Sequence, residues 1–330
     1  MVILGIETSC DETAAALVEN GTKILSNVVA SSLPIHSKEG GVIPETAARE
    51  QLNDIIPVIN LLFPTKAKLS AVDAIAVTFG PGLIGCLFVG VEAAKTLSYV
   101  LDKPIVPINH LIGHLYSAWL ESPKPPKLPL VALIVSGGHT ELLFVPDHGK
   151  FKHLGGTRDD AAGEAFDKIA RLLGLGYPGG PAIEEQALKG DSAKYKLPRP
   201  LAKNPTYDFS FSGLKTATVN LVNQLSESKP LNATTKYDLA ASVQEAIVDV
   251  LVEKTIRATK EYNVNNIVLG GGVAANKHLR AKMTSEYGGG VCFSSPKFAI
   301  DNGAMIASAA YFNFKPVKWD KVKADGAILF

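Results

Sequence analysis

Residues 2–18, which read Val-Ile-Leu-Gly-Ile-Glu-Thr-Ser-Cys-Asp-Glu-Thr-Ala-Ala-Ala-Leu-Val, contain the pattern that decides the fold. An apolar run at 2–6 is followed by a polar stretch at 7–13 and by a second apolar run at 14–18, with Asn20-Gly21 as the next turn signal. Two short apolar runs joined by a polar stretch are typical of a hairpin. The sequence therefore predicts two antiparallel strands with a polar tip at the start of the chain.

The same pattern recurs in the middle of the chain. Leu130–Val135 is apolar, residues 136–141 are small and polar, and Leu142–Val145 is apolar again. An internal duplication is the simplest explanation, and two unrelated hairpins are the alternative. Paired strand–polar turn–strand units, each followed by further strands and helices, resemble the arrangement with which the actin, Hsp70 and sugar-kinase group holds the phosphates of a nucleotide between two lobes. We therefore expect an α/β fold with two lobes.

The chain has 330 residues, which is more than one ordinary core accommodates, so two domains are expected. The Pro-rich stretch 122–129 has the composition of a linker. We expect a first lobe at 1–121, a second lobe at 122–300, and a C-terminal segment at 301–330 that packs back on the first lobe.

The composition is that of a globular protein: 46% of the residues are hydrophobic, 20% are charged, and the net charge is +1. This balance excludes an overall basic nucleic-acid-binding protein, so any contact with nucleic acid requires a local patch. The first residues lack the basic region and long apolar run of a signal peptide. The three cysteines form no CxxC pair, which is typical of a reducing compartment. We therefore expect a cytoplasmic protein that does not enter a membrane.

Two histidines stand four residues apart in the stretch Asn109-His110-Leu111-Ile112-Gly113-His114. The apolar residues around them indicate a helix, which follows a short expected strand at 104–107. A spacing of four places both imidazoles on one face of such a helix. The pair is able to chelate one metal ion, and the alternative is a helix whose histidines only form hydrogen bonds. The spacing alone leaves both interpretations open.

Glycine-rich turns follow several expected strands and helices, at 79–85, 176–181 and 270–272. The third lies between an expected strand at 266–269 and a helix opening at 273–276, an arrangement in which a backbone is able to lie against a nucleotide. It is not a GxGxxG sequence, so a dinucleotide-binding fold is not indicated. The turn at 79–85 either approaches an anion or another chain, or packs closely against its strand.

Two groups of charged residues also have two interpretations each. We expect a helix that is capped by residues 157–160 and ends at Leu173. One face of it carries Asp160, Glu164 and Asp167. These carboxylates either face solvent or lie beside a ligand. The cations of 194–203 either contact a phosphate backbone or belong to a solvated loop.

A helix of small residues is expected at 303–311. Asp301 precedes it, and the simplest role for an aspartate at that position is the N-cap.

Nine motifs occur in a fixed order along the chain. They are Gly5–Thr13, Gly40–Glu45, Gly80–Leu83, Asn109-His110 with His114, Val135–Thr140, Asp159–Lys168, Gly176–Pro181, Phe211–Lys215 and Gly270–Asn276. Together they resemble, over nearly the whole chain, the TsaD (Gcp) family of bacterial and organellar tRNA N6-adenosine threonylcarbamoyltransferases. The resemblance implies the actin-like, Hsp70-like (ASKHA) two-lobed α/β fold.

The resemblance also implies a functional site. The family holds one divalent metal, Fe²⁺ or Zn²⁺, and its ligands correspond to His110, His114 and Asp301. Threonylcarbamoyl-AMP, or ATP or ADP, is expected in the cleft. The residues that correspond to its binding site are Ile134, Val135, Ser136, Gly137, Gly138, Asp167, Gly180, Glu184 and Asn276. Asp11, Glu12 and His139 are the expected catalytic residues, and either His139 or Asp11 is expected to accept or position the proton.

The activity implied by the resemblance is transfer of the threonylcarbamoyl group from threonylcarbamoyl-AMP to N6 of adenosine 37 in tRNAs that read codons beginning with A, with release of AMP. The product is the modified nucleoside t6A. The expected partners are tRNA, the smaller relative TsaB, the ATPase TsaE, and a TsaC-type synthase that supplies threonylcarbamoyl-AMP. The apolar helix from Leu83 to Leu97 is a candidate face for TsaB, although an ordinary core helix has the same pattern.

Three positions depart from the family pattern: Gly156, Glu184 and Ile300 stand where Glu, Asp and Thr are usual. They leave the three metal ligands in place and affect the ribose contact and the surroundings of Asp301. Three other functions are considered. Proteolysis by an HExxH site is disfavoured because Leu111 follows His110. An actin-like kinase or ATPase explains the duplication without needing the histidine pair, and a nucleotide-binding scaffold predicts that His110→Ala leaves function intact.

Overall fold

The computed structural model describes residues 1–39, 41–63, 72–227 and 229–329. Contacts within the chain divide it into two compact units. The first unit comprises Met1–Pro126 and Ser294–Phe330, and the second comprises Lys127–Phe293. Each unit contains a five-stranded mixed sheet.

The first sheet has the strand order β3-β2-β1-β4-β5. Its strands are β1 (Val2–Glu7), β2 (Glu12–Glu19), β3 (Lys23–Ser31), β4 (Ala74–Gly80) and β5 (Ile105–Asn109). The first three form an antiparallel meander, and β4 and β5 then join β1 in parallel. The expected hairpin at the start of the chain is confirmed, because Val2 pairs with Glu19 and Glu7 pairs with Ala14.

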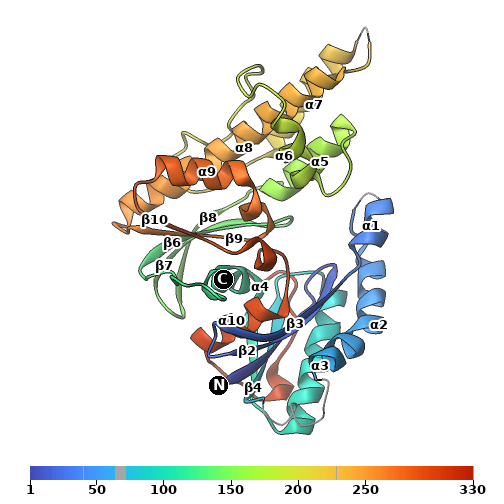
Figure 1. Ribbon diagram of the computed structural model, residues 1–330, viewed down its shortest axis with the longest axis vertical. Coiled ribbons are helices and arrows are strands. Elements are labelled where there is room, and N and C mark those ends of the chain that lie inside the picture. Colours follow the sequence, from blue (N-terminus) through green and yellow to red (C-terminus); the bar gives the residue numbers. More distant parts are fainter. Residues whose placement is uncertain (40, 64–71, 228, 330) are drawn as a thin grey trace. The chain divides into compact units, whose positions relative to one another are not determined.

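The second sheet repeats this topology with the strand order β8-β7-β6-β9-β10. Its strands are β6 (Leu130–Val135), β7 (Thr140–Asp147), β8 (Lys150–Gly156), β9 (Asn266–Gly270) and β10 (Gly290–Phe293). An antiparallel meander of three strands again comes first, and two parallel strands follow. Five strands in the same order and the same directions support the expected internal duplication (Figure 1).

The helices of the first unit pack on its sheet and carry the histidine pair. They are α1 (Leu33–Glu39), α2 (Pro44–Leu62), α3 (Ile84–Leu101), α4 (His110–Tyr116) with the 3-10 turn η2 (Ser117–Trp119), η4 (Pro296–Phe298), α10 (Gly303–Phe312) and the 3-10 turn η5 (Trp319–Lys321). Apolar side chains of β1, β4, α2 and α3 form one core. Among the described residues, α3 alone is long and apolar enough to cross a membrane. It packs against α2 and β4, and 33% of it is buried.

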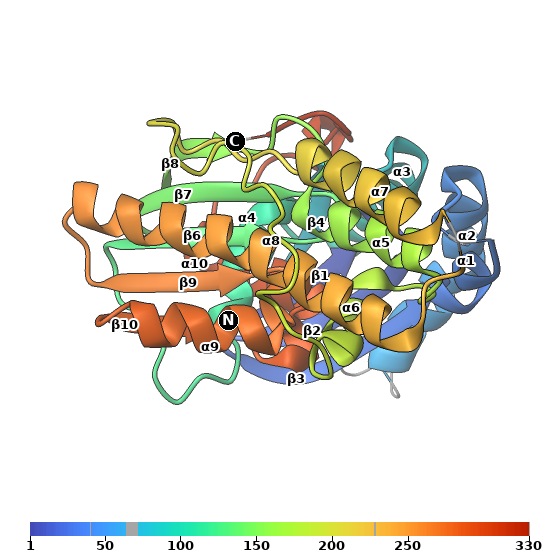
Figure 2. The same cartoon turned by 90° about the horizontal axis from the view of Figure 1, so that it is seen from above.

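The helices of the second unit gather on one face of its sheet (Figure 2). They are α5 (Ala162–Leu173), α6 (Gly179–Ala187), α7 (Ser212–Ser226), α8 (Ala233–Glu261), the 3-10 turn η3 (Gly272–Ala275) and α9 (Lys277–Glu286). Their apolar faces share one core with β6, β7 and β9. The sequence predicts helices from about Tyr237 to Tyr262, and a single long helix, α8, spans nearly all of this region.

Two sequence-based expectations about local structure are wrong. The two glycines and the proline of residues 36–45 predict a loop, but α1 extends through His36 to Glu39, while Gly40 lies outside the described residues. The helix expected to be capped by 157–160 begins at Ala162, and its first backbone amide is bound by the Thr140 hydroxyl at 2.9 Å. A strand residue distant in sequence supplies this contact, and no local pattern reveals it.

Candidate functional site

The two histidines lie at the point where β5 passes into α4. The Asn109 side chain accepts a hydrogen bond from the Leu111 amide at 2.9 Å, which caps the helix immediately ahead of His110. The imidazoles of His110 and His114 are both buried, and their ring centroids are 4.6 Å apart. The expectation of a helix with both rings on one face is confirmed.

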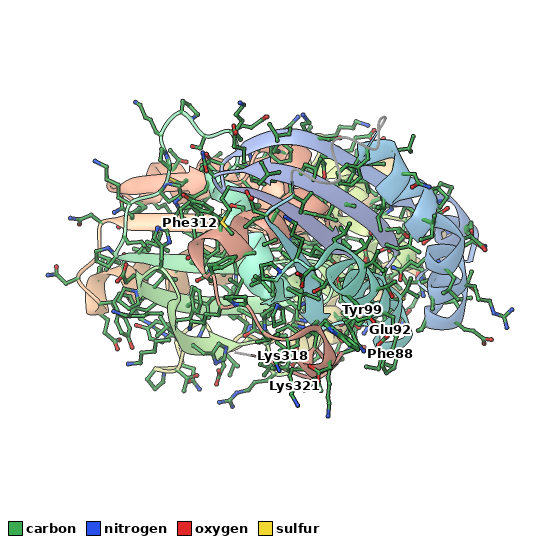
Figure 3. The ribbon with its side chains drawn as sticks, turned by 90° about the horizontal axis from the view of Figure 1, so that it is seen from below. Phe88, Glu92, Tyr99, Phe312, Lys318 and Lys321 are labelled. Atoms are coloured by element: carbon green, nitrogen blue, oxygen red, sulfur yellow. The ribbon has the colours of Figure 1, made fainter. Side chains whose placement is uncertain are left out.

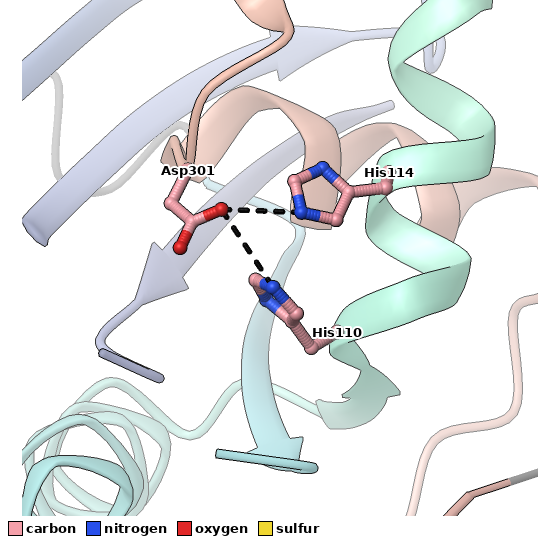
Figure 4. A group of neighbouring side chains, drawn as sticks. All are labelled: His110, His114 and Asp301. Atoms are coloured by element: carbon pink, nitrogen blue, oxygen red, sulfur yellow. Dashed lines mark ion pairs between the residues drawn. The ribbon is translucent and has the colours of Figure 1, made fainter. Parts of the chain in front are cut away.

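Asp301 completes the group from the far end of the chain. Its Oδ1 lies 3.6 Å from Nε2 of His110 and 3.2 Å from Nε2 of His114 (Figure 4). The simple interpretation of Asp301 as the N-cap of α10 is wrong, because Oδ1 of Asn302 accepts the hydrogen bond from the Met305 amide at 3.0 Å. With the cap supplied by the next residue, the Asp301 carboxylate faces the histidines.

The chemistry of these three side chains fits a divalent metal. One ligand atom from each residue lies within 4.8 Å of the others. Within the described part of the chain, neither ring nitrogen of the buried His114 makes a hydrogen bond. A buried imidazole that faces a carboxylate without a hydrogen bond has a lone pair available for a cation. Two imidazoles and one carboxylate suit Fe²⁺ or Zn²⁺ and leave coordination positions open for a substrate.

Glu7, which the sequence analysis did not select, supports the first histidine from behind. It is fully buried at the end of β1, and its Oε2 lies 3.1 Å from Nδ1 of His110 and accepts a hydrogen bond from the Thr78 hydroxyl. Ser9 also approaches Nδ1 of His110, at 3.1 Å. A carboxylate that accepts the Nδ1 proton leaves Nε2 of the same ring to bind a metal. The sequence signal that could have identified Glu7 is an acidic residue at the end of an otherwise apolar strand.

The charge of His110 depends on the same carboxylates. Burial disfavours the charged imidazolium, but Asp301 and Glu7 outweigh burial and raise the pKa of His110 to about 9. Both carboxylates therefore stabilise positive charge at this position. The site attracts either a proton or a metal cation, and the two compete for Nε2.

Three more ionisable residues occupy the turn between β1 and β2. Burial and the Asp11 carboxylate raise the pKa of the Cys10 thiol far above its usual range, so this thiol stays neutral. Burial, then Asp11 and Asp301, raise the pKa of Glu12 to about 9, and the Ser31 hydroxyl donates to Glu12 at 2.9 Å. The raised pKa of Glu12 therefore favours a proton on this acidic pair.

The turn between β6 and β7 carries the corresponding residues of the second unit. Ser136 and His139 close this turn, since the Ser136 amide donates to the His139 carbonyl at 2.9 Å. A Cβ added to Gly137 or Gly138 meets no atom within 4 Å, so the space beside this backbone is open. Ile134 and Val135 are fully buried in β6, so a ligand can meet only their backbone.

Two helix starts lie next to this turn. A Cβ at Gly163 would stand 2.4 Å from the Ser136 carbonyl oxygen, so glycine allows α5 to approach the turn. One turn along α5, Oδ1 of Asp167 accepts a hydrogen bond from the Gly179 amide at the start of α6, at 2.6 Å. Gly180 borders open space. The amides of Ala162, Gly163 and Gly179 at these starts are bound within the protein, which leaves the backbone at Gly180 to face an anion.

Glu184 and Asn276 use their side chains within the protein. Oε1 of Glu184 accepts a hydrogen bond from the Lys277 amide at 2.5 Å. Asn276 caps α9 through the Leu279 amide at 2.9 Å, and its Nδ2 donates to Gln244 at 2.9 Å. Both residues therefore fix the start of α9, a role that their motif positions did not reveal.

Asp160 does not share a helix face with Asp167, contrary to the sequence-based expectation, because it precedes α5. Its two carboxylate oxygens bind Lys168 at 2.7 Å and Lys215 at 2.8 Å. The neighbouring Asp159 accepts hydrogen bonds from the amides of Phe211 and Ser212, at 2.8 and 3.2 Å, and so caps the start of α7. The paired aspartates organise the 211–215 motif.

Comparison with solved structures shows the fold. The chain is similar to HypF of T. kodakarensis, with a TM-score of 0.60 at 15% identity over 94% of this chain and 47% of that one. It is also similar to the activator of the 2-hydroxyisocaproyl-CoA dehydratase from Clostridium difficile, with a TM-score of 0.54 at 14% identity over 95% of each chain. These likenesses confirm the expected actin-like, two-lobed α/β fold.

Comparison with sequences shows the family. The model of the family TsaD, tRNA N6-adenosine threonylcarbamoyltransferase, matches residues 23–308. The chain is 50% identical to the protein of that name from Syntrophomonas wolfei, over 95% of this chain and 92% of that protein. It is 51% identical to the one from Symbiobacterium thermophilum, over 94% of this chain and 91% of that protein. The chain therefore belongs to the TsaD family of tRNA N6-adenosine threonylcarbamoyltransferases and is an enzyme of the transferase class.

Proposed function

We propose that this chain transfers the threonylcarbamoyl group from threonylcarbamoyl-AMP to N6 of adenosine 37 in tRNAs that read codons beginning with A, and that it acts in the cytoplasm. The observation that carries the proposal is the convergence of His110, His114 and Asp301, since an acyl transferase benefits from a metal beside the reacting carbonyl whereas a kinase of the same fold needs no such triad. The names of the relatives support the reaction class.

In this reaction the N6 amine attacks the acyl carbonyl carbon, the new C–N bond forms, and the bond from that carbon to the phosphate oxygen breaks. AMP leaves with the electron pair, and N6 loses a proton. The exocyclic amine of adenosine is a weak nucleophile, so placement and carbonyl polarisation must supply the rate. When bound at His110, His114 and Asp301, Fe²⁺ or Zn²⁺ supplies Lewis-acid polarisation of the carbonyl oxygen.

The acidic pair at the β1–β2 turn has the properties of a proton-transfer site. The raised pKa of Glu12 favours its protonated form, which is a hydrogen-bond donor. We assign the acceptance of the N6 proton to the neighbouring Asp11. His139 is the alternative acceptor. Asp11→Asn and His139→Ala, compared for single-turnover rate, distinguish the two.

The second unit offers the binding site proposed for the adenylate. Open space borders the backbone at Gly137, Gly138 and Gly180, and the starts of α5 and α6 lie beside it. Backbone amides at such positions suit the phosphate of AMP. Asp167 is held at the α6 start by the Gly179 amide, and burial raises the pKa of its carboxyl group.

The partner surface proposed for TsaB is the apolar groove between α2 and α3. Its volume is about 820 Å³, and it is lined by Leu52, Ile56 and Phe88, whose side chains are 64%, 59% and 52% exposed. Exposed apolar grooves of this size are sites for protein partners. TsaE and a TsaC-type synthase complete the proposed system. Phe88→Glu should abolish co-elution with TsaB, and Lys229→Glu, on the second unit, should not.

The test of function is mass spectrometry of nucleosides from tRNA in bacteria that lack their own enzyme and carry either this chain or Asp301→Ala. We expect t6A with the intact chain and none with the variant. Asp147→Ala, an exposed aspartate at the end of β7, is the matched control and should restore t6A. If the intact chain forms none even in vitro with cognate TsaB and TsaE, the proposal fails, and a kinase or a scaffold explains the fold better.

A further inference from the structure

The segment that follows α10, residues 313–329, is a basic and exposed part of the first unit. It contains four lysines, Lys315, Lys318, Lys321 and Lys323, against two aspartates, and so has a net charge of +2, whereas the whole chain has +1. All four lysines are exposed. Across the described residues, none of their ammonium groups forms an ion pair or a side-chain hydrogen bond. Unpaired cations of this kind are available to an external polyanion.

The segment is fixed to the sheet, so its lysines have defined positions. The Val317 amide binds the Ile105 carbonyl at 2.9 Å, and the Asp325 amide binds the Phe79 carbonyl at 2.8 Å. Val322 is 3% exposed and belongs to the core of the unit. Because Val322 points inward, the flanking Lys321 and Lys323 point outward. Binding here therefore requires little ordering of the backbone.

The segment leads toward the metal triad. It pairs with Ile105 at the start of β5, and the Asn109 side chain, at the end of β5, donates to the Leu329 carbonyl. The residue after Asn109 is His110. Five residues of a strand span on the order of 16 Å. Lys318 therefore lies next to the start of β5, while the end of the segment reaches the residue that precedes the first metal ligand.

Aromatic side chains lie among these cations. Trp319 packs edge to face on Tyr99 of α3, with ring centroids 5.3 Å apart, and the two residues are 43% and 68% exposed. Figure 3 shows Lys318 and Lys321 beside Tyr99 on one side of the unit. Lysines contact phosphates, and exposed aromatic rings stack with unpaired bases, which is the combination used to bind single-stranded RNA loops.

We propose that residues 313–329, together with Tyr99, form a docking surface for a part of the tRNA sugar-phosphate backbone that lies on the order of 16 Å from the nucleotide that is modified. The inference rests on the proposed function, which requires an anticodon loop to reach the triad. It assigns the phosphate contacts to Lys318 and Lys321 and the stacking surface to Trp319 and Tyr99.

A second cationic stretch, 194–203, is less suited to this role. Arg199 is bound to Asp249 at 2.6 Å, and Lys203 lines a cavity whose other walls include Asp249, Glu253 and Glu286. Carboxylates neutralise much of the positive charge there and repel phosphates. Lys194 and Lys196 of this stretch are exposed, so they provide a competing site and a matched control.

The experiment compares the full-length protein with Lys318→Glu/Lys321→Glu and with Lys194→Glu/Lys196→Glu, which change the net charge equally. The probe is an unmodified tRNA transcript, and the dissociation constant is measured over a range of salt concentrations. We expect the first variant to bind at least about tenfold more weakly, with the slope of log K against log salt reduced by about 1.5, because two phosphate contacts are lost. The second variant should bind as the intact chain does.

Each other outcome overturns the inference. If Lys318→Glu/Lys321→Glu binds tRNA as tightly as the intact chain, the surface does not contact tRNA. Equal weakening by both variants indicates unspecific attraction, and loss of TsaB binding without loss of tRNA binding identifies a protein-docking surface. If the intact chain shows neither tRNA binding nor transfer, the proposed function fails instead. Metal content and thermal unfolding of every variant verify that the fold is retained.

Discussion

Oε2 of Glu7 lies 3.1 Å from Nδ1 of His110, on the side of the imidazole opposite to the nitrogen that faces Asp301. β1 supplies this carboxylate, the histidine begins α4 directly after β5, and β1 and β5 are separated in the sheet by β4. The hydrogen bond selects the tautomer in which Nε2 carries the free lone pair. Glu7 is therefore a positioning residue for the metal ligand.

Replacing Glu7 by Gln should weaken metal binding by about 10- to 100-fold, since the neutral amide no longer increases the basicity of His110. Competitive titration with a metal chelator measures this change, and it requires no active enzyme. Glu19→Gln, an exposed glutamate at the end of β2, is the matched control. Unchanged affinity in Glu7→Gln would mean that the hydrogen bond only stabilises the fold.

Substitutions of Asp301 and Asn302 should affect metal binding and helix capping separately. We expect Asp301→Asn to lose the metal while its unfolding free energy without metal stays close to that of the intact chain. Asn302→Ala should cost about 1 kcal/mol of stability because the cap of α10 is lost. Denaturant unfolding of both variants in the presence of a chelator provides the comparison. A large loss of stability in Asp301→Asn would contradict the division of roles.

The two carboxyl groups of the β1–β2 turn should respond differently to amide substitution. Because the raised pKa of Glu12 favours its protonated form, Glu12→Gln keeps a neutral donor and should retain activity within about tenfold. Asp11→Asn removes the base and should reduce the single-turnover rate by about 10²- to 10⁴-fold. Equal losses in both variants would indicate that the pair positions the substrate without transferring a proton.

Lys254 should make stability depend on pH. It is fully buried in α8, its Nζ donates to the Thr206 carbonyl at 2.9 Å, and burial followed by the charge of Arg257 lowers its pKa to about 8. Between pH 8 and the pKa of the unfolded chain, about 10.4, the unfolded state binds more protons, so the free energy of unfolding rises with pH by at most about 3 kcal/mol.

Lys254→Met should remove this rise. The measurement is the unfolding free energy of the variant and of the intact chain from pH 7 to 10.5, and the difference between the two should change with pH. Lys260→Met, an exposed lysine of the same helix, should leave it in place. A difference that does not vary with pH would show that Lys254 carries its charge in the folded state.

Two glycines near the Ser136 turn should give opposite results. Gly163→Ala places a Cβ 2.4 Å from the Ser136 carbonyl oxygen and should destabilise the second unit by about 1–3 kcal/mol. Gly137→Ala meets no protein atom and should fold normally, but it should weaken nucleotide binding because its methyl group occupies the open space beside the turn. Calorimetric titration with AMP and thermal unfolding measure the two effects.

Local patterns determined much of this structure. The apolar runs around Glu7–Thr13 and Ser136–Glu141 predicted both hairpins, because alternation between apolar strands and polar turns reflects burial within a short stretch. The spacing of His110 and His114 likewise placed two imidazoles on one helix face, since helical geometry is local.

Tertiary structure alone decided which distant side chains complete these local features. Asp301 was assigned to the metal by resemblance, and its carboxylate faces the histidines only because Asn302 caps α10. Glu7 reaches His110 across β4, and Thr140 caps α5 from a strand. Contacts between residues far apart in sequence produce no periodic pattern in the chain. The sequence by itself therefore determined the helices, the strands and their buried faces, whereas tertiary packing determined the partners of each buried polar group.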